Sequence, residues 1–171
     1  MSVPRAGLRV ATAAAVLAGL AVAVPQASAT GRPAVKISAK ADSTTRALVQ
    51  ADPSRAAAAA TVCGSGYALS RVIPLPVGVD PSVRKGTLFA YENSGNGCAI
   101  LDNNVGGAKY MYLYVCRVDG TGCDTDTGNF SEYAGPVYVT SFACAPVTAK
   151  MGTTSSNLYF NYNSEYVFPC D

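Results

Sequence analysis

The sequence predicts a small all-β domain over residues 63–171, an antiparallel β-sandwich or barrel stapled by three disulfides. All six Cys residues lie in this stretch, together with all ten Tyr and all five Phe residues. Short apolar or alternating segments recur there, separated by turns rich in Gly, Asn and Pro. No segment carries the i, i+3, i+4, i+7 apolar spacing of a long amphipathic helix. A single modest core is what such a length can supply.

Residues 1–29 have the pattern of a secretory signal peptide. Arg5 and Arg9 precede an apolar run at 11–24, and Ala27-Ser28-Ala29 matches a cleavage site of small residues. The apolar run is shorter than the roughly 20 residues that span a bilayer. We therefore expect a secreted, extracellular protein that has no membrane partner after cleavage.

Residues 30–62 contain neither Cys nor aromatic residues and include the run Ala56–Ala60. Little apolar surface is available there to offset the entropy of ordering the chain. We expect a linker or pro-segment that is disordered, apart from a short helix at 44–51 ended by Pro53.

Within the β domain, turn residues divide the chain into short strands. Gly and Asn supply left-handed backbone and Pro fixes bends, which predicts turns at 74–76, 93–97, 103–107 and 126–129. The predicted strands are 67–73, 87–92, 98–102, 110–118, 136–143, 146–151 and 158–162.

The cysteines follow a predicted signal peptide, so an oxidising compartment and three disulfides are expected. The pair Asp119-Gly120 favours a hairpin turn that places Cys116 opposite Cys123, and a bulged turn suits a disulfide there better than a strict two-residue turn. Fifteen connectivities are open to six cysteines. Besides that pair, we favour successive loops closed by Cys63–Cys98 and Cys144–Cys170.

One predicted strand has two different faces. Tyr110, Tyr112 and Tyr114 alternate with aliphatic residues, so the tyrosines share one face and the aliphatic side chains the other. The aliphatic face belongs to the core. The tyrosine face is either a second packing layer or a platform for a polymer. With Tyr138, these three tyrosines are the candidate binding surface.

Composition excludes several kinds of chemistry. The chain has no His, so it holds no Ser-His-Asp triad and no imidazole ligand for a metal. Charged residues make up 14% of the chain, unlike a nucleic-acid-binding protein. No nucleotide-binding motif is present. We expect no enzyme activity, cofactor, metal or nucleic-acid partner.

Carboxylates are the remaining candidates for catalysis. Two of them could act as acid and base on a glycan, or several could bind Ca²⁺, although a solvated turn accounts better for the group near 119–132. The candidates are Asp119, Asp124, Asp126, Glu132 and Glu165.

Two segments resemble a known family. Cys63-Gly64-Ser65-Gly66-Tyr67 and the stretch 126–139, which ends in Tyr-Ala-Gly-Pro-Val-Tyr-Val, resemble spore-associated protein A and its secreted relatives in filamentous actinobacteria. The resemblance covers roughly 63–171. It implies a small secreted β domain found with spores or aerial hyphae, and it implies no catalytic or binding residues.

The residues and the resemblance lead to one expected function and two alternatives. We expect a non-catalytic protein of the spore or cell surface that contacts a cell-wall or spore-coat polymer, or other copies of itself. One alternative is an inhibitor of extracellular proteases that presents the loops 73–79 and 93–97. The other is a glycan-active enzyme that uses two of the carboxylates named above.

Overall fold

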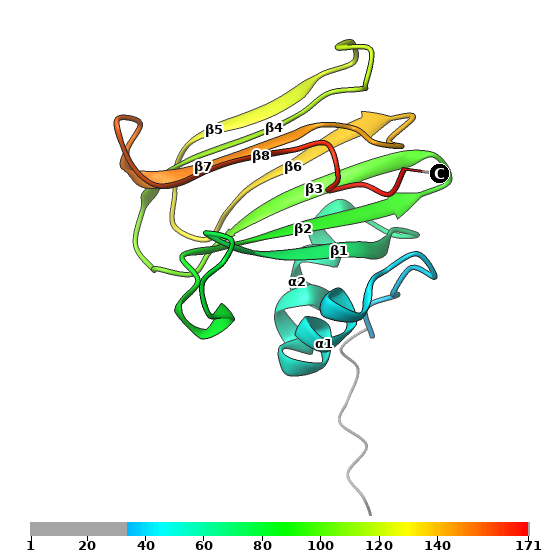
Figure 1. Cartoon of the computed structure of the whole chain (residues 1–171), viewed down its shortest axis with the longest axis horizontal. Coiled ribbons are helices and arrows are strands. Elements are labelled where there is room, and N and C mark those ends of the chain that lie inside the picture. The colour runs from blue at the N-terminus through cyan, green and yellow to red at the C-terminus, as the bar shows by residue number, and fades with distance from the viewer. Residues whose placement is uncertain (1–33, 171) are drawn as a thin grey trace, which may run out of the picture. The chain divides into compact units, whose positions relative to one another are not determined.

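Figure 1 shows the computed structural model, which describes residues 34–170. The predicted signal peptide lies outside these residues. Within them, no helix has the length and apolar character needed to cross a membrane. Two α-helices come first, α1 (Ser43–Ala51) and α2 (Pro53–Cys63). The strands are β1 (Ala68–Leu75), β2 (Gly86–Asn93), β3 (Asn96–Asn103), β4 (Lys109–Val115), β5 (Asp124–Phe130), β6 (Tyr133–Thr140), β7 (Val147–Thr154) and β8 (Asn157–Ser164), with a 3-10 turn η1 (Pro81–Val83) between β1 and β2.

The eight strands form two antiparallel sheets of four. Sheet A has the order β1-β2-β3-β6, and sheet B has the order β5-β4-β7-β8. The sheets stack with the helices on the far side of sheet A, so the molecule has three layers (Figure 1). The all-β prediction is confirmed as a sandwich; over the described residues the sheets do not close into a barrel.

The main core fills the space between the two sheets. Alternate residues of β2 and β4 face it, among them Leu88, Met111, Leu113 and Val115, none of which is exposed. This is the period of two that the sequence of β4 shows. The C-terminal segment closes one end, where Phe168 packs so tightly on Gly97 that a Cβ there would meet its ring at 2.8 Å.

A second core lies between sheet A and the helices, and it corrects the disorder predicted for residues 30–62. Over residues 34–62, that prediction is wrong except for the helix at 44–51, which the structure extends to Ser43–Ala51. Val49, Ala56 and Ala59 pack on Phe89 and Ile100 of sheet A. The segment is poor in apolar residues, but it uses apolar surface that the sheet supplies.

Both helices begin at a capping aspartate. Asp42 accepts a hydrogen bond from the backbone N–H of Thr45 at 2.6 Å, and Asp52 accepts one from that of Arg55 at 3.2 Å. Pro53 begins α2, where its missing N–H and fixed φ cost nothing. The proline predicted to end the first helix therefore also starts the second one.

Strand β5 corrects a second prediction, since residues 126–129 form strand rather than turn. Asp, Gly and Asn have low strand propensity, but here they pair along β4, with Tyr112 opposite Thr127. The carboxylates of Asp124 and Asp126 also accept hydrogen bonds from the backbone N–H groups of Tyr138 and Gly135 on β6, at 2.8 and 2.7 Å. These side chains connect the edges of the two sheets.

The three predicted disulfides are confirmed. Cys63–Cys98 joins the end of α2 to β3, Cys116–Cys123 closes the hairpin between β4 and β5, and Cys144–Cys170 holds the C-terminus. The hairpin uses the bulged form of turn.

The turn of that hairpin has three residues rather than two. The N–H groups of Arg117 and Gly120 donate to the carbonyls of Thr121 and Arg117, and Gly120 has a φ of 76°. A type I turn followed by a left-handed glycine is the usual geometry of a three-residue loop.

Candidate functional site

The outer face of sheet B carries a row of tyrosines that the rest of the described chain leaves uncovered. Tyr110, Tyr112 and Tyr114 of β4 point away from the core, and each is partly exposed. The residues between them on the same strand are fully buried. We call this surface the tyrosine face: the three tyrosines and their outward-facing neighbours on β5, β7 and β8. Within the described residues, no second packing layer buries these three side chains, whose exposure is intermediate.

The neighbours of the tyrosines across the sheet are polar and mostly uncharged. Tyr112 lies between Thr127 on β5 and Lys150 on β7, and Asn161 follows on β8. The corresponding rows beside the other two tyrosines complete the face with Thr125, Asn129, Thr148 and Asn163. The face therefore combines aromatic rings with hydroxyl and amide groups, which can both donate and accept hydrogen bonds.

Two contacts order the rings at the centre of this face. The rings of Tyr112 and Tyr114 are nearly parallel, with an interplanar angle of 21° and centroids 6.3 Å apart. The ammonium group of Lys150 lies 5.0 Å from the centroid of the Tyr112 ring, within the range of a cation–π interaction. Rings ordered in this way lose less entropy when a ligand binds them.

The Cys116–Cys123 bridge holds one end of the row. The hydroxyl of Tyr114 lies 2.6 Å from Sγ of Cys116 and 3.1 Å from Sγ of Cys123. Disulfide sulfurs carry no hydrogen, so the tyrosine is the donor in both contacts. The hairpin and the tyrosine face are therefore one structural unit.

Tyr138 does not lie on this face. It pairs with Cys98 of β3, whose side chain lies on the helix side of sheet A. Its ring is 6.2 Å from that of Tyr67, and its hydroxyl donates to the carbonyl of Cys63 at 3.4 Å. The structure brings together three of the four candidate tyrosines and leaves Tyr138, which is 41% exposed, on a separate surface.

The candidate carboxylates have different surroundings. Asp124 and Asp126 bind backbone N–H groups of β6, as described above. Asp119 caps the hairpin turn: it accepts hydrogen bonds from Thr121, which lower the pKa of its carboxyl, and it pairs with Arg117 at 3.0 Å. Glu165 lies just after β8 and is exposed. Across residues 34–170, no group of three or more Cys, Asp or Glu residues is arranged to hold a metal ion.

Glu132 lines a shallow groove that it shares with Asp126, beside the turn between β5 and β6, and it also lines a larger groove. The larger groove has a volume of about 850 Å³ and lies between α2 and the edge formed by β3 and the start of β6. Ile100 and Ala59 contribute apolar surface, while Ser131, Asn103 and Tyr133 contribute polar groups. Two further carboxylates, Asp52 and Asp102, line the same groove. The sequence did not single them out, because Asp102 lies near the end of an otherwise ordinary strand and Asp52 lies in the segment expected to be disordered.

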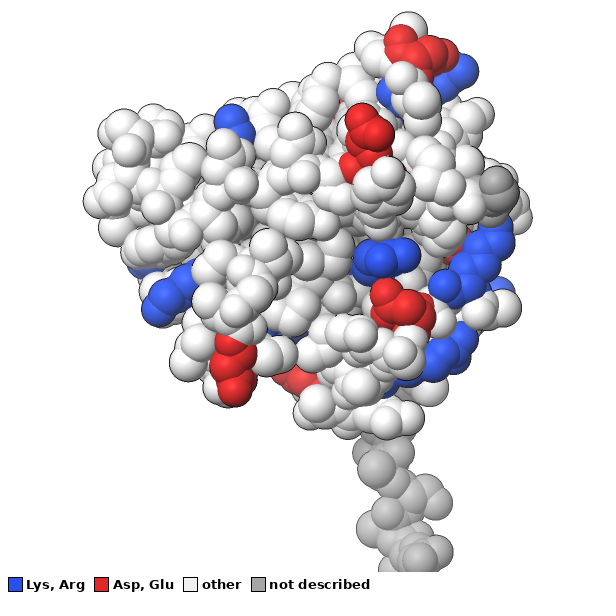
Figure 2. Space-filling view, viewed as in Figure 1, with Lys and Arg blue, Asp and Glu red and all other residues white. Residues whose placement is uncertain are grey.

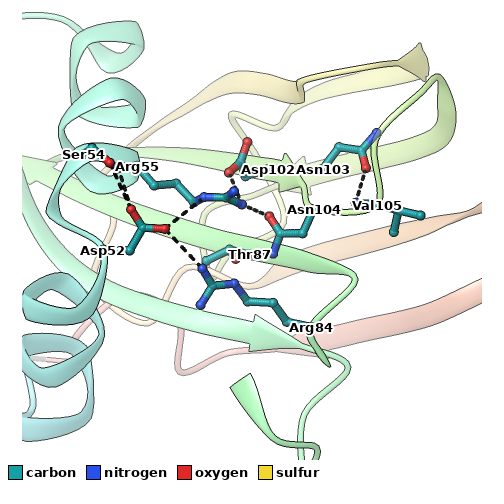
Figure 3. A network of polar contacts seen from close by, with 9 residues as sticks. All are labelled: Asp52, Ser54, Arg55, Arg84, Thr87, Asp102, Asn103, Asn104 and Val105. Carbon is teal, nitrogen blue, oxygen red and sulfur yellow. Dashed lines mark hydrogen bonds and ion pairs between the residues drawn. The ribbon is translucent and has the colours of Figure 1, made fainter. Parts of the chain in front are cut away.

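Asp102 belongs to a network that attaches α2 to sheet A (Figure 3). Arg55 of α2 contacts Asp102 at 3.0 Å, Asp52 at 3.3 Å and the side chain of Asn104. Arg84 reaches Asp52 at 3.4 Å from the loop before β2. Burial raises the pKa of Asp102, although the charges of Arg55 and Arg84 oppose that shift. The charged groups of this network bind one another, so the network contributes to the docking of α2 beside the apolar contacts of the second core.

Comparison with known proteins supports the resemblance found in the sequence. The chain is 34% identical over 107 residues to Spore-associated protein A of Streptomyces coelicolor. The match covers 60% of this chain and 63% of the relative, which is less than two thirds of its length.

Two further comparisons found no match. No family model matches the chain, and no solved structure matches it. The fold therefore rests on the geometry described above, and the family resemblance rests on the shared sequence. The sequence match therefore supports a relationship between this chain and the spore-associated protein A family.

Proposed function

We propose that this protein is a non-catalytic extracellular protein of the spore or cell surface that binds a polymer through the tyrosine face. The observation that carries the proposal is the row formed by Tyr110, Tyr112 and Tyr114 on an uncovered sheet. Three disulfides and a predicted signal peptide support an extracellular location. The name of the relative, Spore-associated protein A, supports the association with spores.

The geometry suits an extended, hydroxyl-rich polymer such as a cell-wall glycan. Tyrosines two residues apart on one strand recur about every 6.8 Å, so their rings form a ladder along β4. A sugar ring can lie against an aromatic ring with its C–H groups, while its hydroxyls bond to Thr127, Asn161 or their neighbours. The face carries a single charge, Lys150, so binding depends little on salt.

The test is retention of the purified protein on spore-wall and cell-wall material, compared with an unrelated disulfide-rich protein. The informative variant combines Tyr110→Ser and Tyr112→Ser, and it keeps Tyr114 because that hydroxyl contacts the Cys116–Cys123 bridge. We expect this variant to bind about tenfold more weakly, the loss of roughly 1.4 kcal/mol.

The matched control combines Tyr138→Ser and Tyr166→Ser, which removes two exposed tyrosines that lie outside the tyrosine face. We expect the control to bind as the parent protein does. Circular dichroism and urea denaturation check that both variants fold. Equal binding by the two double variants would contradict the proposal, as would retention of the parent protein no greater than that of the unrelated protein.

Protease inhibition is a second candidate, favoured by one observation. The loop after β1 exposes two apolar side chains, Val77 at 59% and Val79 at 40%. A braced loop that presents apolar side chains can occupy the specificity pocket of a protease. By contrast, the candidate loop 93–97 is a tight turn between the paired ends of β2 and β3. Unchanged hydrolysis by subtilisin-like and trypsin-like enzymes at micromolar protein would remove this candidate.

A further inference from the structure

The two sheets have four edge strands, and within the described residues three of them make contacts beyond their own sheet. β5 and β6 are connected by Asp124 and Asp126, whose carboxylates accept hydrogen bonds from the backbone of β6. At β1, residues 36–38 add a short parallel bridge: the N–H of Ser38 donates to Leu69, and the N–H of Leu69 donates to Lys36, at 2.8 and 2.7 Å. These contacts use two backbone N–H groups of β6 and both backbone groups of Leu69 on β1, and they place two carboxylates on β5, where charge discourages pairing with another chain.

β8 is the remaining edge strand. In the part of the chain that the structure describes, its backbone pairs with β7 and with no other strand. Edge strands that must stay unpaired usually carry a charge, a proline or a bulge. The nearest charged residues are Lys150 and Glu165, and no proline lies between them.

Bulges affect only the start of this strand. The register between β7 and β8 shifts around Gly152, beside Asn157 and Leu158, and is regular from Phe160 to Ser164. The regular part therefore presents about five residues of uncharged edge. Asn161 and Asn163 are exposed there, and each side chain holds both a donor and an acceptor.

We propose that β8 pairs antiparallel with β8 of a second copy of this chain. A two-fold axis at Tyr162 places Asn161 of each copy opposite Asn163 of the other, where the amide groups can bond to each other. Such an interface uses the same surface twice, as in most homodimers. It joins two copies of sheet B into one eight-stranded sheet and makes their tyrosine faces continuous. This inference does not rest on what the tyrosine face binds.

The experiment is sedimentation of the disulfide-bonded protein over a range of concentrations, without any polymer. The test variant combines Asn161→Glu and Asn163→Glu, which sets like charges against each other across the two-fold axis. Glu was chosen because residue 161 lies opposite Lys150, so a Lys there would also weaken the pairing of β7 with β8. The matched control, Thr127→Glu with Asn129→Glu, adds the same charge at the β5 edge of the same sheet.

We expect the parent protein and the control to form dimers, and the test variant to have a dissociation constant at least about tenfold higher. Hydrogen exchange gives an independent readout, because the amides of 160–164 should exchange more slowly as the parent protein dimerises, whereas those of β5 should not change. A monomeric parent protein up to about 1 mM would overturn the proposal. Dimers that withstand the β8 substitutions would overturn it too, and neither outcome bears on polymer binding.

Discussion

The outer faces of the two sheets are built from similar strands but differ in burial. On sheet A, Phe89, Tyr91 and Ile100 lie under the helices and are at most 3% exposed. On sheet B, Tyr110 and Tyr112 occupy the equivalent outward positions and stay partly exposed. A tyrosine is thus a core residue on one face and a surface residue on the other.

The polar end of each tyrosine reflects this difference. Tyr91 donates its hydroxyl to the carbonyl of Ala56 at 2.8 Å, and burial raises its pKa. The hydroxyl of Tyr114 instead contacts the surface bridge between β4 and β5. Figure 2 shows charged side chains scattered among larger areas of other residues. Among the side chains that make up the tyrosine face, Lys150 carries the single charge. The comparison separates an outer face that belongs to a core from an outer face that stays open to solvent.

The largest expected effect tests that comparison directly. Phe89→Ala should lower the free energy of unfolding by about 3–5 kcal/mol, because it leaves a cavity between sheet A and the helices. Tyr112→Ala, on the open face, should cost less than about 1.5 kcal/mol, since water can fill the space. Urea denaturation with the disulfides intact measures both values.

Similar costs for the two substitutions would show that the faces are equally buried in solution. That result would remove the basis for the tyrosine face as a contact surface. Phe89→Leu is the milder control on the same site, and we expect it to keep most of the stability because it keeps most of the volume.

Periodicity explains which of these features the sequence could predict. The alternation at 110–115 identifies the open face, since one buried side and one exposed side produce a period of two. The burial of sheet A under the helices corresponds to a different sequence pattern. The run Leu88-Phe89-Ala90-Tyr91 is continuously apolar, as in strands buried on both sides. That run indicates a second layer, but it does not say which segment of the chain supplies it.

Positions that depend on distant contacts could not be predicted in the same way. Residues 34–62 order themselves on a sheet formed by later residues, so their own composition is a poor guide. Tyr138 follows Ala134 by four residues on the same strand, a spacing that predicts one shared face for both. The face that Tyr138 joins depends instead on how its strand pairs with β3. The sequence around Asp124 and Asp126 is typical of a solvated turn, and only the neighbouring strand β6 shows what their carboxylates bind.

The next largest effect concerns two of the disulfides, one beside each of these faces. Replacing both Cys63 and Cys98 by Ala opens a loop with a sequence separation of 35. The loop-closure entropy predicts that this change lowers the free energy of unfolding by about 4 kcal/mol. The same change at Cys116 and Cys123, with a separation of 7, should cost about 2.5 kcal/mol. Thermal and urea unfolding of the two double variants compare them.

The second of these variants should also affect binding. Loss of the bridge between β4 and β5 frees the hydroxyl of Tyr114 and loosens one end of the tyrosine face. We therefore expect weaker retention on wall material for the variant at Cys116 and Cys123 and unchanged retention for the one at Cys63 and Cys98. The reverse pattern would place the contact surface on the helix side of sheet A.

The smallest effect concerns the network that attaches α2, through the pH dependence of stability. Because burial raises the pKa of Asp102 above its usual 3.8, the folded state holds this proton more tightly than the unfolded state. Its contribution is fully present below pH 3.8 and is lost as the pH rises through the folded pKa. Asp102→Asn removes that loss, so the stability of the variant relative to the parent should increase with pH across this window.

Asp119→Asn, in the hairpin of the other sheet, should show the opposite trend. Hydrogen bonds from Thr121 lower the pKa of Asp119, so its carboxylate favours the folded state above pH 3.8 and that benefit is lost on acidification. Relative to the parent, this variant should therefore become less stable as the pH rises toward 3.8 from below. Urea titrations between about pH 2 and pH 7 follow both differences. Parallel trends for the two variants would mean that the charges of Arg55 and Arg84 outweigh the effect of burial on the pKa of Asp102. No trend for Asp102→Asn would mean that Asp102 is as well solvated in the folded state as in the unfolded state.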